Sequence, residues 1–379
     1  MDFRNDEMHE ELLAVYKDFA ENAVAPIAAE LDEQERFPEE LLPTMAEMGL
    51  MGIPFPEEYG GTGMDELSYV QCVEEISKKC ASTGVTLSAH TSLGAWPIYH
   101  FGTDEQKAKY LPDLCSGKKL GAFGLTEPGA GTDAAGQKTV AEDKGDYYLM
   151  NGSKMFITNA AYADIFIVMA MTDKSQGTKG ISAFIIEKGM PGFSIGKKEH
   201  KMGIRGSNTC ELIFEDVKVP KENLLGKLGK GFALAMQTLD GGRIGIAAQA
   251  LGIAEGALDV TIEYVKQRQQ FGKPIAAFQN TQFELAQMKA NTEAAKLLVY
   301  RAANCVDNGL PYSVEAAEAK LVASRNASDV TRRCLQLYGG YGYTREYPIE
   351  RMMRDAKITE IYEGTSEVQM MVIGGSLVR

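Results

Sequence analysis

Histidine, cysteine and tryptophan are scarce in this chain of 379 residues, which contains four histidines, six cysteines and one tryptophan. The histidines are scattered, with no His-Glu-x-x-His motif and no carboxylate at the spacing of a zinc site. The cysteines form no Cys-x-x-Cys pair, which is typical of reduced, buried thiols in a cytosolic protein. The sequence therefore predicts no metal site, and we expect a carboxylate to carry any acid–base chemistry.

An excess of positive charge and long apolar runs are also lacking. Lys and Arg number 39 against 52 Asp and Glu, and the net charge of −13 argues against general nucleic-acid binding while leaving room for a local phosphate pocket. The longest apolar runs, such as residues 165–171, are too short to cross a bilayer, so we expect no membrane insertion. The N-terminal stretch MDFRNDEMHEELL resembles neither a signal peptide nor a transit peptide. We expect a cytoplasmic, bacterial protein rather than a mitochondrial matrix form.

The change of residue pattern along the chain predicts three domains. Residues 1–118 and 229–379 show helical periodicity, whereas residues 119–228 carry short β-type runs separated by turn residues. These runs lack the intervening helices, about a dozen residues long, that parallel βαβ units need. We therefore expect a mainly α protein, with a central antiparallel β-barrel between an N-terminal helical domain and a C-terminal helical bundle.

Apolar spacing and turn residues also predict individual elements. The expected N-terminal helices lie around residues 12–23, 67–79 and 107–115. The expected strands cover residues 147–150, 155–158, 165–171, 181–186 and 212–219, with a turn at 151–153. The expected C-terminal helices cover residues 232–239, 244–268, 279–308, 313–338 and 348–373.

Two segments of the middle zone are candidates for ligand binding. Residues 126–133 (TEPGAGTD) contain a Gly-x-Gly-x-x-Ala pattern, but a dinucleotide fingerprint must lie within a βαβ unit, which this context does not predict. The glycines would let backbone N–H groups approach a phosphate or ring edge, although the local residues favour a plain surface turn. In residues 155–159 (MFITN), Phe156 and Thr158 would share one strand face and suit a flat ring, with a core Phe as the simpler interpretation.

Three further candidate sites lie in the C-terminal zone. Arg268 with Phe271 suits a pyrophosphate–adenine ligand, or the arginine simply neutralises a helix C-terminus. Residues 240–243 (DGGR) are expected to form a tight polar break between two apolar helices, where the charges need partners. In residues 361–367 (IYEGTSE), burial would raise the pKa of Glu363 and make it a general base, although a solvated Glu at a helix end is the commoner outcome.

The order of these motifs carries more information than any one of them. LTEPGAGTD, KMFITN, DGGR, RQQFGKPIAAFQ, QLYGGYGY and IYEGTSE follow one another as in the acyl-CoA dehydrogenase family, which the chain resembles over essentially its whole length. Within that family it looks most like the short-chain, butyryl-CoA type. The resemblance implies an N-terminal helical domain, a middle β-barrel and a four-helix bundle. It also implies FAD as cofactor, an acyl-CoA substrate, electron-transferring flavoprotein as partner, and a homotetramer in which the adenine end of FAD touches a neighbouring subunit.

The resemblance also implies roles for individual residues. The positions that match the flavin end of the FAD site are Phe123, Leu125, Thr126, Gly131, Thr132, Phe156 (where many relatives have Trp), Ile157 and Thr158. The positions that match the diphosphate and adenosine across the interface are Arg268, Phe271 and Gln279, with a second FAD segment at Gln336, Gly339 and Gly340. Thr365 and Glu367 match further FAD contacts, and Thr132, Asp240 and Arg243 match CoA contacts. Gly364 matches a position beside the substrate, and Glu363 matches the catalytic base.

One comparison within the family narrows the assignment. Isovaleryl- and long-chain-type relatives carry the base on the helix after Asp240, where this chain has Gly242. The chain therefore resembles the short-chain, medium-chain and glutaryl branch. The implied reaction is removal of the substrate α-proton by Glu363 and transfer of the β-hydrogen as hydride to FAD. The product is a trans-2-enoyl-CoA, and the physiological direction stays open.

Other functions remain as alternatives. A glutaryl-CoA or medium-chain acyl-CoA dehydrogenase would share these motifs. A glutaryl enzyme needs a cation for the distal carboxylate, and residues 84–99, which we expect to line the acyl pocket, contain no Lys or Arg. A non-redox scaffold that binds CoA or a nucleotide is the alternative from another class, and it would be colourless.

Overall fold

Side-chain caps define where several N-terminal helices begin in the computed structural model, which describes residues 5–378. Asp6 accepts a hydrogen bond from the His9 N–H, and Asp65 accepts one from the Ser68 N–H. Thr103 and Gln106 form a reciprocal capping box. The N-terminal helices are α1 (Glu7–Phe19), α2 (Ala28–Glu33), α3 (Leu41–Glu47), α4 (Glu66–Lys79), α5 (Ala81–Ser88), α6 (Trp96–Phe101) and α7 (Asp104–Cys115). The expected helical N-terminal zone is confirmed.

The middle zone folds into one sheet around a buried strand. Every residue of β4 (Ile165–Met171) is buried, as its continuous apolar run predicts. The other strands are β1 (Gly121–Gly124), β2 (Val140–Asp143), β3 (Tyr147–Thr158), β5 (Ile181–Glu187), β6 (Phe193–Lys198), β7 (Thr209–Pro220) and β8 (Leu224–Leu225). Their order is β6-β7-β3-β2-β4-β5-β8, with β1 paired to β4.

The sheet differs from the expected antiparallel barrel in two respects. β1 and β2 both pair with β4 in the parallel direction, so the sheet is mixed. Within the described residues, the hydrogen-bonded path runs from β6 to β8 without joining these two ends. The parallel pairs arise without βαβ units because the β2–β3 hairpin lies between β1 and β4 in the chain. The absence of crossover helices therefore did not exclude parallel pairing.

The prediction of a turn at residues 151–153 is wrong, because strand β3 continues through these residues. The register between β3 and β7 shifts between Met150 and Gly152, which marks a β-bulge. Gly152 has φ +143°, and a Cβ there would lie 2.7 Å from the Cα of Thr139. The glycine therefore permits a close approach of two chain segments. A second register shift lies between Lys154 and Ile157, where Phe156 adopts φ +61°. The shift interrupts the regular alternation of side chains along β3, on which the expectation of a shared face for Phe156 and Thr158 depended.

The C-terminal zone is helical, with two boundaries that differ from expectation. Its elements are α8 (Gly231–Gln267), β9 (Gln269–Gln270), β10 (Lys273–Pro274), α9 (Gln279–Asp307), α10 (Ser313–Tyr338), α11 (Ile349–Ile358) and α12 (Ser366–Leu377). Residues 240–243 are not a break, because α8 passes through them; burial of the flanking apolar residues outweighs the low helix propensity of two glycines. The single helix expected at 348–373 is instead α11 and α12, since Glu363 and Gly364 have positive φ values that no α-helix contains.

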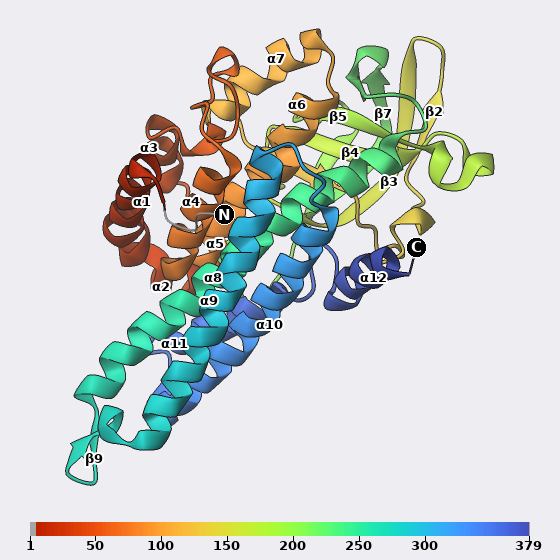
Figure 1. The fold of residues 1–379 in the computed structure, drawn as a ribbon. Helices are drawn as coiled ribbons and strands as arrows, with labels where there is room; N and C mark the ends of the chain where they lie inside the picture. Colours follow the sequence, from red (N-terminus) through yellow and green to blue (C-terminus); the bar gives the residue numbers. More distant parts are fainter. Residues whose placement is uncertain (1–4, 379) are drawn as a thin grey trace.

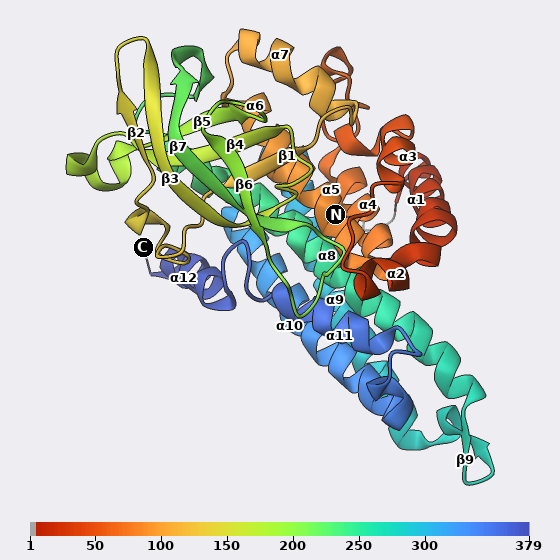
Figure 2. The same cartoon turned by 180° about the vertical axis from the view of Figure 1, so that it is seen from behind.

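Helix α8 forms the centre of the molecule. Figures 1 and 2 show the N-terminal helices and the sheet at one end of the long C-terminal bundle, and the β9–β10 hairpin at the other end. By length and hydropathy α8 would suffice to cross a membrane, but 89% of its most apolar window is buried inside the protein. Its neighbours include α4, α9 and α10. It is therefore built as a core helix.

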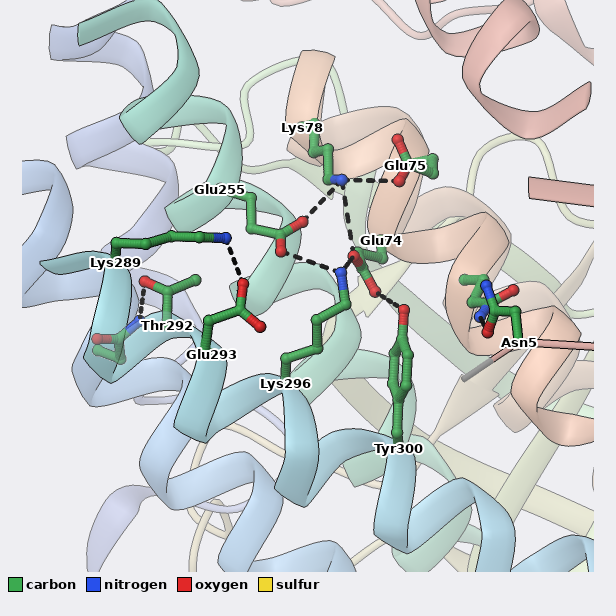
Figure 3. Close-up of polar contacts among 12 residues, drawn as sticks. Asn5, Glu74, Glu75, Lys78, Glu255, Lys289, Thr292, Glu293, Lys296 and Tyr300 are labelled. Atoms are coloured by element: carbon green, nitrogen blue, oxygen red, sulfur yellow. Dashed lines mark hydrogen bonds and ion pairs between the residues drawn. The ribbon is translucent and has the colours of Figure 1, made fainter. Parts of the chain in front are cut away.

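A buried ionic network joins α4, α8 and α9 (Figure 3). The fully buried Glu74 carboxylate accepts hydrogen bonds from Lys296 Nζ at 2.8 Å and Tyr300 Oη at 2.9 Å. Glu255 pairs with Lys296 at 3.1 Å and with Lys78 at 2.7 Å. Burial and the neighbouring Glu255 carboxylate raise the pKa of Glu74. The network thus holds the N-terminal helices on the bundle through charges that depend on one another.

We expect Lys296→Met to lower the free energy of unfolding by about 3 kcal/mol, because it leaves two buried carboxylates short of a cation. Lys289→Met is the matched control on the same helix: Lys289 pairs with Glu293, but its side chain is 60% exposed, and the expected loss is less than about 1 kcal/mol. Urea unfolding midpoints measure both. Equal effects of the two substitutions would contradict a structural role for the network.

Candidate functional site

Glu363 lies in a strained segment between α11 and α12. Its φ is +53° and that of Gly364 is +93°, and a left-handed non-glycine residue costs about 1 kcal/mol or more. Three contacts hold the segment in place. Gln369 Nε2 donates to the Gly364 carbonyl at 2.9 Å, Lys320 Nζ donates to the same oxygen at 2.5 Å, and Thr365 caps α12. The surrounding contacts therefore determine the direction in which Glu363 points.

The Glu363 carboxyl group lies directly over Gly242 of α8. A Cβ built on Gly242 would lie 2.2 Å from Glu363 Oε2 and 2.9 Å from Cδ2 of Leu93. Oε2 is buried and has no hydrogen-bond partner within residues 5–378. Burial raises the pKa of Glu363 to about 7, against the opposing charges of Lys320 and Arg243. A carboxyl group with this pKa and a free buried oxygen is suited to accept a proton near neutral pH.

The backbone beside this carboxyl group also has unused bonding capacity. Among the described residues, the Glu363 N–H donates no hydrogen bond. The Tyr362 hydroxyl donates to Gln249 Oε1, and Gln249 Nε2 donates to the Ala81 carbonyl at 2.9 Å, so the neighbouring side chain is anchored to the N-terminal helices. A backbone donor next to a potential base is the arrangement that stabilises charge developing on a substrate oxygen.

Asp240 and Arg243 lie one helical turn apart on α8, on either side of Gly242, over which the Glu363 carboxyl group lies. Arg243 Nη1 donates to Asp240 Oδ1 at 2.5 Å, and the Arg243 side chain is nearly buried. Burial lowers the pKa of Arg243 and raises that of Asp240. Within the described chain, Arg243 Nε has no partner. The pair therefore presents a spare donor close to the carboxyl group.

Leu93 connects this site to the segment expected to line an acyl pocket. It lies in the π-helical stretch Ala89–Ala95, within residues 84–99, and touches the space over Gly242 that the Glu363 carboxyl group borders. π-helical turns are frequent at functional sites because they displace side chains from regular helical positions. The structure thus brings Leu93, within residues 84–99, next to the Glu363 carboxyl group.

The middle-zone candidates gather around one loop. The Met155 N–H donates to the Thr126 carbonyl at 2.8 Å, so the loop after β1 lies along the end of β3. The Phe156 side chain is 58% exposed. A Cβ at Gly129 or Gly131 would meet nothing within 4 Å. An exposed aromatic ring beside an open glycine turn and the hydroxyls of Thr126 and Thr158 suits a flat, polar-edged ligand.

A buried ion pair beneath this loop was not predicted from the sequence. Lys154 Nζ, fully buried, contacts Glu127 Oε1 at 2.7 Å, Gln137 Oε1 at 3.0 Å and the Leu125 carbonyl at 3.1 Å. Burial lowers the pKa of Lys154 to about 8. A signal was present, because Lys154 is in phase with the buried residues Tyr148 and Met150 along β3. The pair fixes the start of the loop while its tip stays exposed.

The remaining candidates lie at the far end of the bundle (Figures 1 and 2). The Arg268 guanidinium lies 5.2 Å from the ring centre of Tyr341, which follows Gln336, Gly339 and Gly340. Phe271, in the β9–β10 hairpin, is 93% exposed. The part of α8 between Gly242 and Gln267 is about 38 Å long at the α-helical rise. The structure therefore separates these residues and Gln279 from the Glu363 region of the same chain.

A separate cavity lies elsewhere on the molecule. It has a volume of about 390 Å³ and lies between the segment before α3 and strands β6 and β7. Its lining consists of Gln34, Glu35, Arg36, Phe37, Ala161, Tyr162, Ile195, Gly196, Lys198, Asn208 and Cys210. None of the candidate residues lines this cavity, which is therefore separate from the Glu363 carboxyl group and its neighbours. The described residues contain no group of His, Cys, Asp and Glu suited to a metal ion.

Comparison with known proteins covers nearly the whole chain. Three family models match: "Acyl-CoA dehydrogenase, N-terminal domain" over residues 6–118, the middle domain over 122–217 and the C-terminal domain over 229–378. A short-chain specific acyl-CoA dehydrogenase of Clostridium acetobutylicum is 60% identical over all of both chains.

Two solved structures have the same fold. Butyryl-CoA dehydrogenase from Megasphaera elsdenii matches with a TM-score of 0.98 and 56% identity, over all of both chains. A chain in a structure of the electron-transferring flavoprotein of Acidaminococcus fermentans, described in work on flavin-based electron bifurcation, matches with a TM-score of 0.99 and 57% identity, again over all of both chains.

The raised pKa of Glu363 predicts a pH-dependent effect of Glu363→Gln. Between the ordinary value of 4.5 and about 7, the folded protein holds a proton that the unfolded chain has released, so the native protein loses stability as the pH rises through this window. The variant lacks this loss. We expect the Tm of Glu363→Gln, relative to that of the native protein, to be higher at pH 8 than at pH 4.5. Calorimetry at both pH values measures it, and a constant difference would contradict the burial of this carboxyl group.

Proposed function

The chain belongs to the acyl-CoA dehydrogenase family, and we propose that it interconverts butyryl-CoA and crotonyl-CoA. It is an FAD-dependent oxidoreductase that acts on CH–CH bonds. The observation that carries the proposal is the Glu363 carboxyl group over Gly242, buried, with one oxygen unpartnered and a pKa of about 7. The names of the similar bacterial enzymes support a short acyl chain.

Glu363 acts as the base that removes the substrate α-proton. The α-proton of a thioester is weakly acidic, so the base must work beside groups that stabilise the charge developing on the thioester oxygen. The Glu363 N–H is the donor that this chain offers for that oxygen. Arg243 and Asp240 contact the CoA portion, together with Thr132, and Gly364 lies beside the acyl chain.

The cofactor is FAD, and the residues present fit it. Bound FAD accepts the β-hydrogen of the substrate together with its electron pair. The exposed Phe156 ring and the open glycine turn at Gly129 and Gly131 suit the flat flavin and its polar edge. The flavin end is held by Phe123, Leu125, Thr126, Gly131, Thr132, Phe156, Ile157 and Thr158, with Thr365 and Glu367.

The adenosine end of FAD is held by a neighbouring subunit of a homotetramer. The distance along α8 supports this assignment, because Arg268 and the Glu363 region of one chain lie too far apart for a single FAD to contact both. The residues offered to the neighbour are Arg268, Phe271, Gln279, Gln336, Gly339 and Gly340. The 93% exposure of Phe271 is in keeping with a role at a contact between subunits.

The electron partner is electron-transferring flavoprotein, and the enzyme works in the bacterial cytoplasm. The similarity to a chain in the Acidaminococcus structure supports this partner, and the bacterial relatives support the location.

The domain boundaries that we propose are 1–118, 119–228 and 229–379. Residues 1–4 and 379 lie outside the described residues, and the ranges of the three family models support these limits.

Anaerobic flavin absorbance tests the function and its chain length. Butyryl-CoA should bleach the flavin faster than acyl-CoAs of longer chain up to C12 and faster than glutaryl-CoA. Glu363→Gln should keep its flavin but bleach at least about 1000-fold more slowly, because the base is lost. Near-normal bleaching by the variant would refute the assigned base. Faster bleaching with C8 or glutaryl-CoA would favour a medium-chain or glutaryl enzyme, and a colourless protein that FAD does not reconstitute would favour a non-redox scaffold.

Gly242→Ala should lower the bleaching rate by about 100-fold, because its methyl group displaces the Glu363 carboxyl group from its position. Gly241→Ala is the matched control in the adjacent helical position, where a Cβ meets nothing within 4 Å. We expect its rate to stay close to that of the native enzyme. If both variants bleach at the same rate, the close contact between α8 and Glu363 does not determine the activity.

A further inference from the structure

Lys320 is a buried cation that the sequence motifs do not include. It lies on α10, and its side chain is fully buried. Within residues 5–378 it forms no direct ion pair, and its Nζ donates to the Gly364 carbonyl at 2.5 Å. A buried ammonium group without a paired carboxylate is costly, so the fold must compensate for it. Its position suggests what it does, because the only hydrogen bond recorded for it within the described chain ends on the residue next to Glu363.

The hydrogen bond from Lys320 acts on the conformation of the Glu363 segment. Glu363 and Gly364 both have positive φ values. Gln369 Nε2 also donates to the Gly364 carbonyl, at 2.9 Å, and lies 3.3 Å from the Glu363 carbonyl. Two side chains from different helices therefore fix the direction of one peptide group. Loss of either donor would let the strained segment relax toward an ordinary backbone conformation.

The charge of Lys320 acts on the carboxyl group itself. The charged and titratable groups that interact with the charge of Glu363 are Lys320 on α10, Arg243 on α8, Tyr69 on α4 and the neighbouring Tyr362. Asp240 acts on Arg243, and Glu360 and Glu367 act on Lys320. Lys320 and Arg243 are the two cations among them, and both favour the ionised carboxylate against the effect of burial. Arg243 is already paired with Asp240. Lys320 has no such paired carboxylate within the described residues. Burial lowers its pKa to about 8, against the charges of Glu363, Glu360 and Glu367, so Lys320 carries its positive charge at and below neutral pH.

We propose that Lys320 is a positioning residue for the dehydrogenation reaction: its ammonium group ties down the Gly364 carbonyl and so aims Glu363, while its charge favours the proton-accepting carboxylate. This inference rests on the proposed function for its catalytic meaning. The effects of Lys320 on the Gly364 carbonyl and on the charge of Glu363 do not depend on that function. Lys320 does not touch the reacting atoms and acts only through Glu363.

The decisive measurement is the pH profile of anaerobic flavin bleaching by butyryl-CoA. Lys320→Met should shift the rising limb of the profile upward by about one pH unit, since an opposite charge nearby lowers a carboxyl pKa by that order. Its plateau rate should fall at least about tenfold, because the carboxyl group is misdirected. Lys320→Arg should leave the rising limb of the profile at its native pH, because the positive charge is kept. Lys320→Gln should shift the rising limb as Lys320→Met does. Arg332→Gln, at an exposed position on the same helix, is the control and should match the native profile.

Two further readouts separate positioning from general damage. The affinity for a thioether analogue of butyryl-CoA, which cannot react, should change less than about threefold in Lys320→Met, because the binding contacts remain. A loss of rate without a shift of the limb, or a native profile in Lys320→Met, overturns the proposal. If Lys320→Met does not fold, Lys320→Gln against Lys320→Arg makes the same comparison.

A measurement without substrate keeps this inference independent of the proposed function. The pH at which the Tm of Glu363→Gln diverges from that of the native protein reports the ionisation of Glu363. In a Lys320→Gln background this divergence should extend to higher pH by about one unit. If the divergence does not move, Lys320 does not set the charge of Glu363, even if butyryl-CoA bleaches the flavin. If it moves and no acyl-CoA bleaches the flavin, the proposed function fails and the electrostatic coupling stands.

Discussion

The contact between the Glu363 carboxyl group and the bare backbone of Gly242 is the constraint on which the site depends. A Cβ at Gly242 would lie 2.2 Å from Glu363 Oε2, so only glycine leaves room for the carboxyl group at this point of α8. A side chain at residue 242 and the carboxyl group of Glu363 would therefore occupy the same space. One of the two must give way, and in this chain a glycine in the central helix does so.

Burial has opposite consequences on the two sides of this contact. It removes the Glu363 carboxyl group from water and raises its pKa to about 7, which suits a base near neutral pH. It also places Lys320 and Arg243 in the interior, where each charge needs compensation. The buried polar groups follow the same pattern around Glu74, where the N-terminal helices meet the bundle, and around Lys154, inside the middle zone. The protein therefore secures its strained site with buried charges that are satisfied by more than one element.

Sequence patterns predicted the elements whose signals are local. The apolar run 165–171 became β4, and the three-zone organisation followed from the change of periodicity. Patterns failed where contacts from elsewhere decide the local conformation. Residues 240–243 stay helical because α8 is buried on both sides of them, and residues 151–153 form a bulge because β2 and β7 flank β3. The helix break at Glu363 depends on donors from α10 and α12, which no local pattern contains.

The sequence by itself determined the order of the motifs, the choice of Glu363 over residue 242 as the carboxylate, and the three zones, because these depend on residue identity and short-range spacing. Only the tertiary structure decided that Glu363 lies over Gly242, that Lys320 holds the peptide beside it, and that Gly242 and the end of α8 before Arg268 lie about 38 Å apart. These facts depend on how helices distant in the sequence pack together. Packing is set by the whole molecule, and no single segment of the chain contains it.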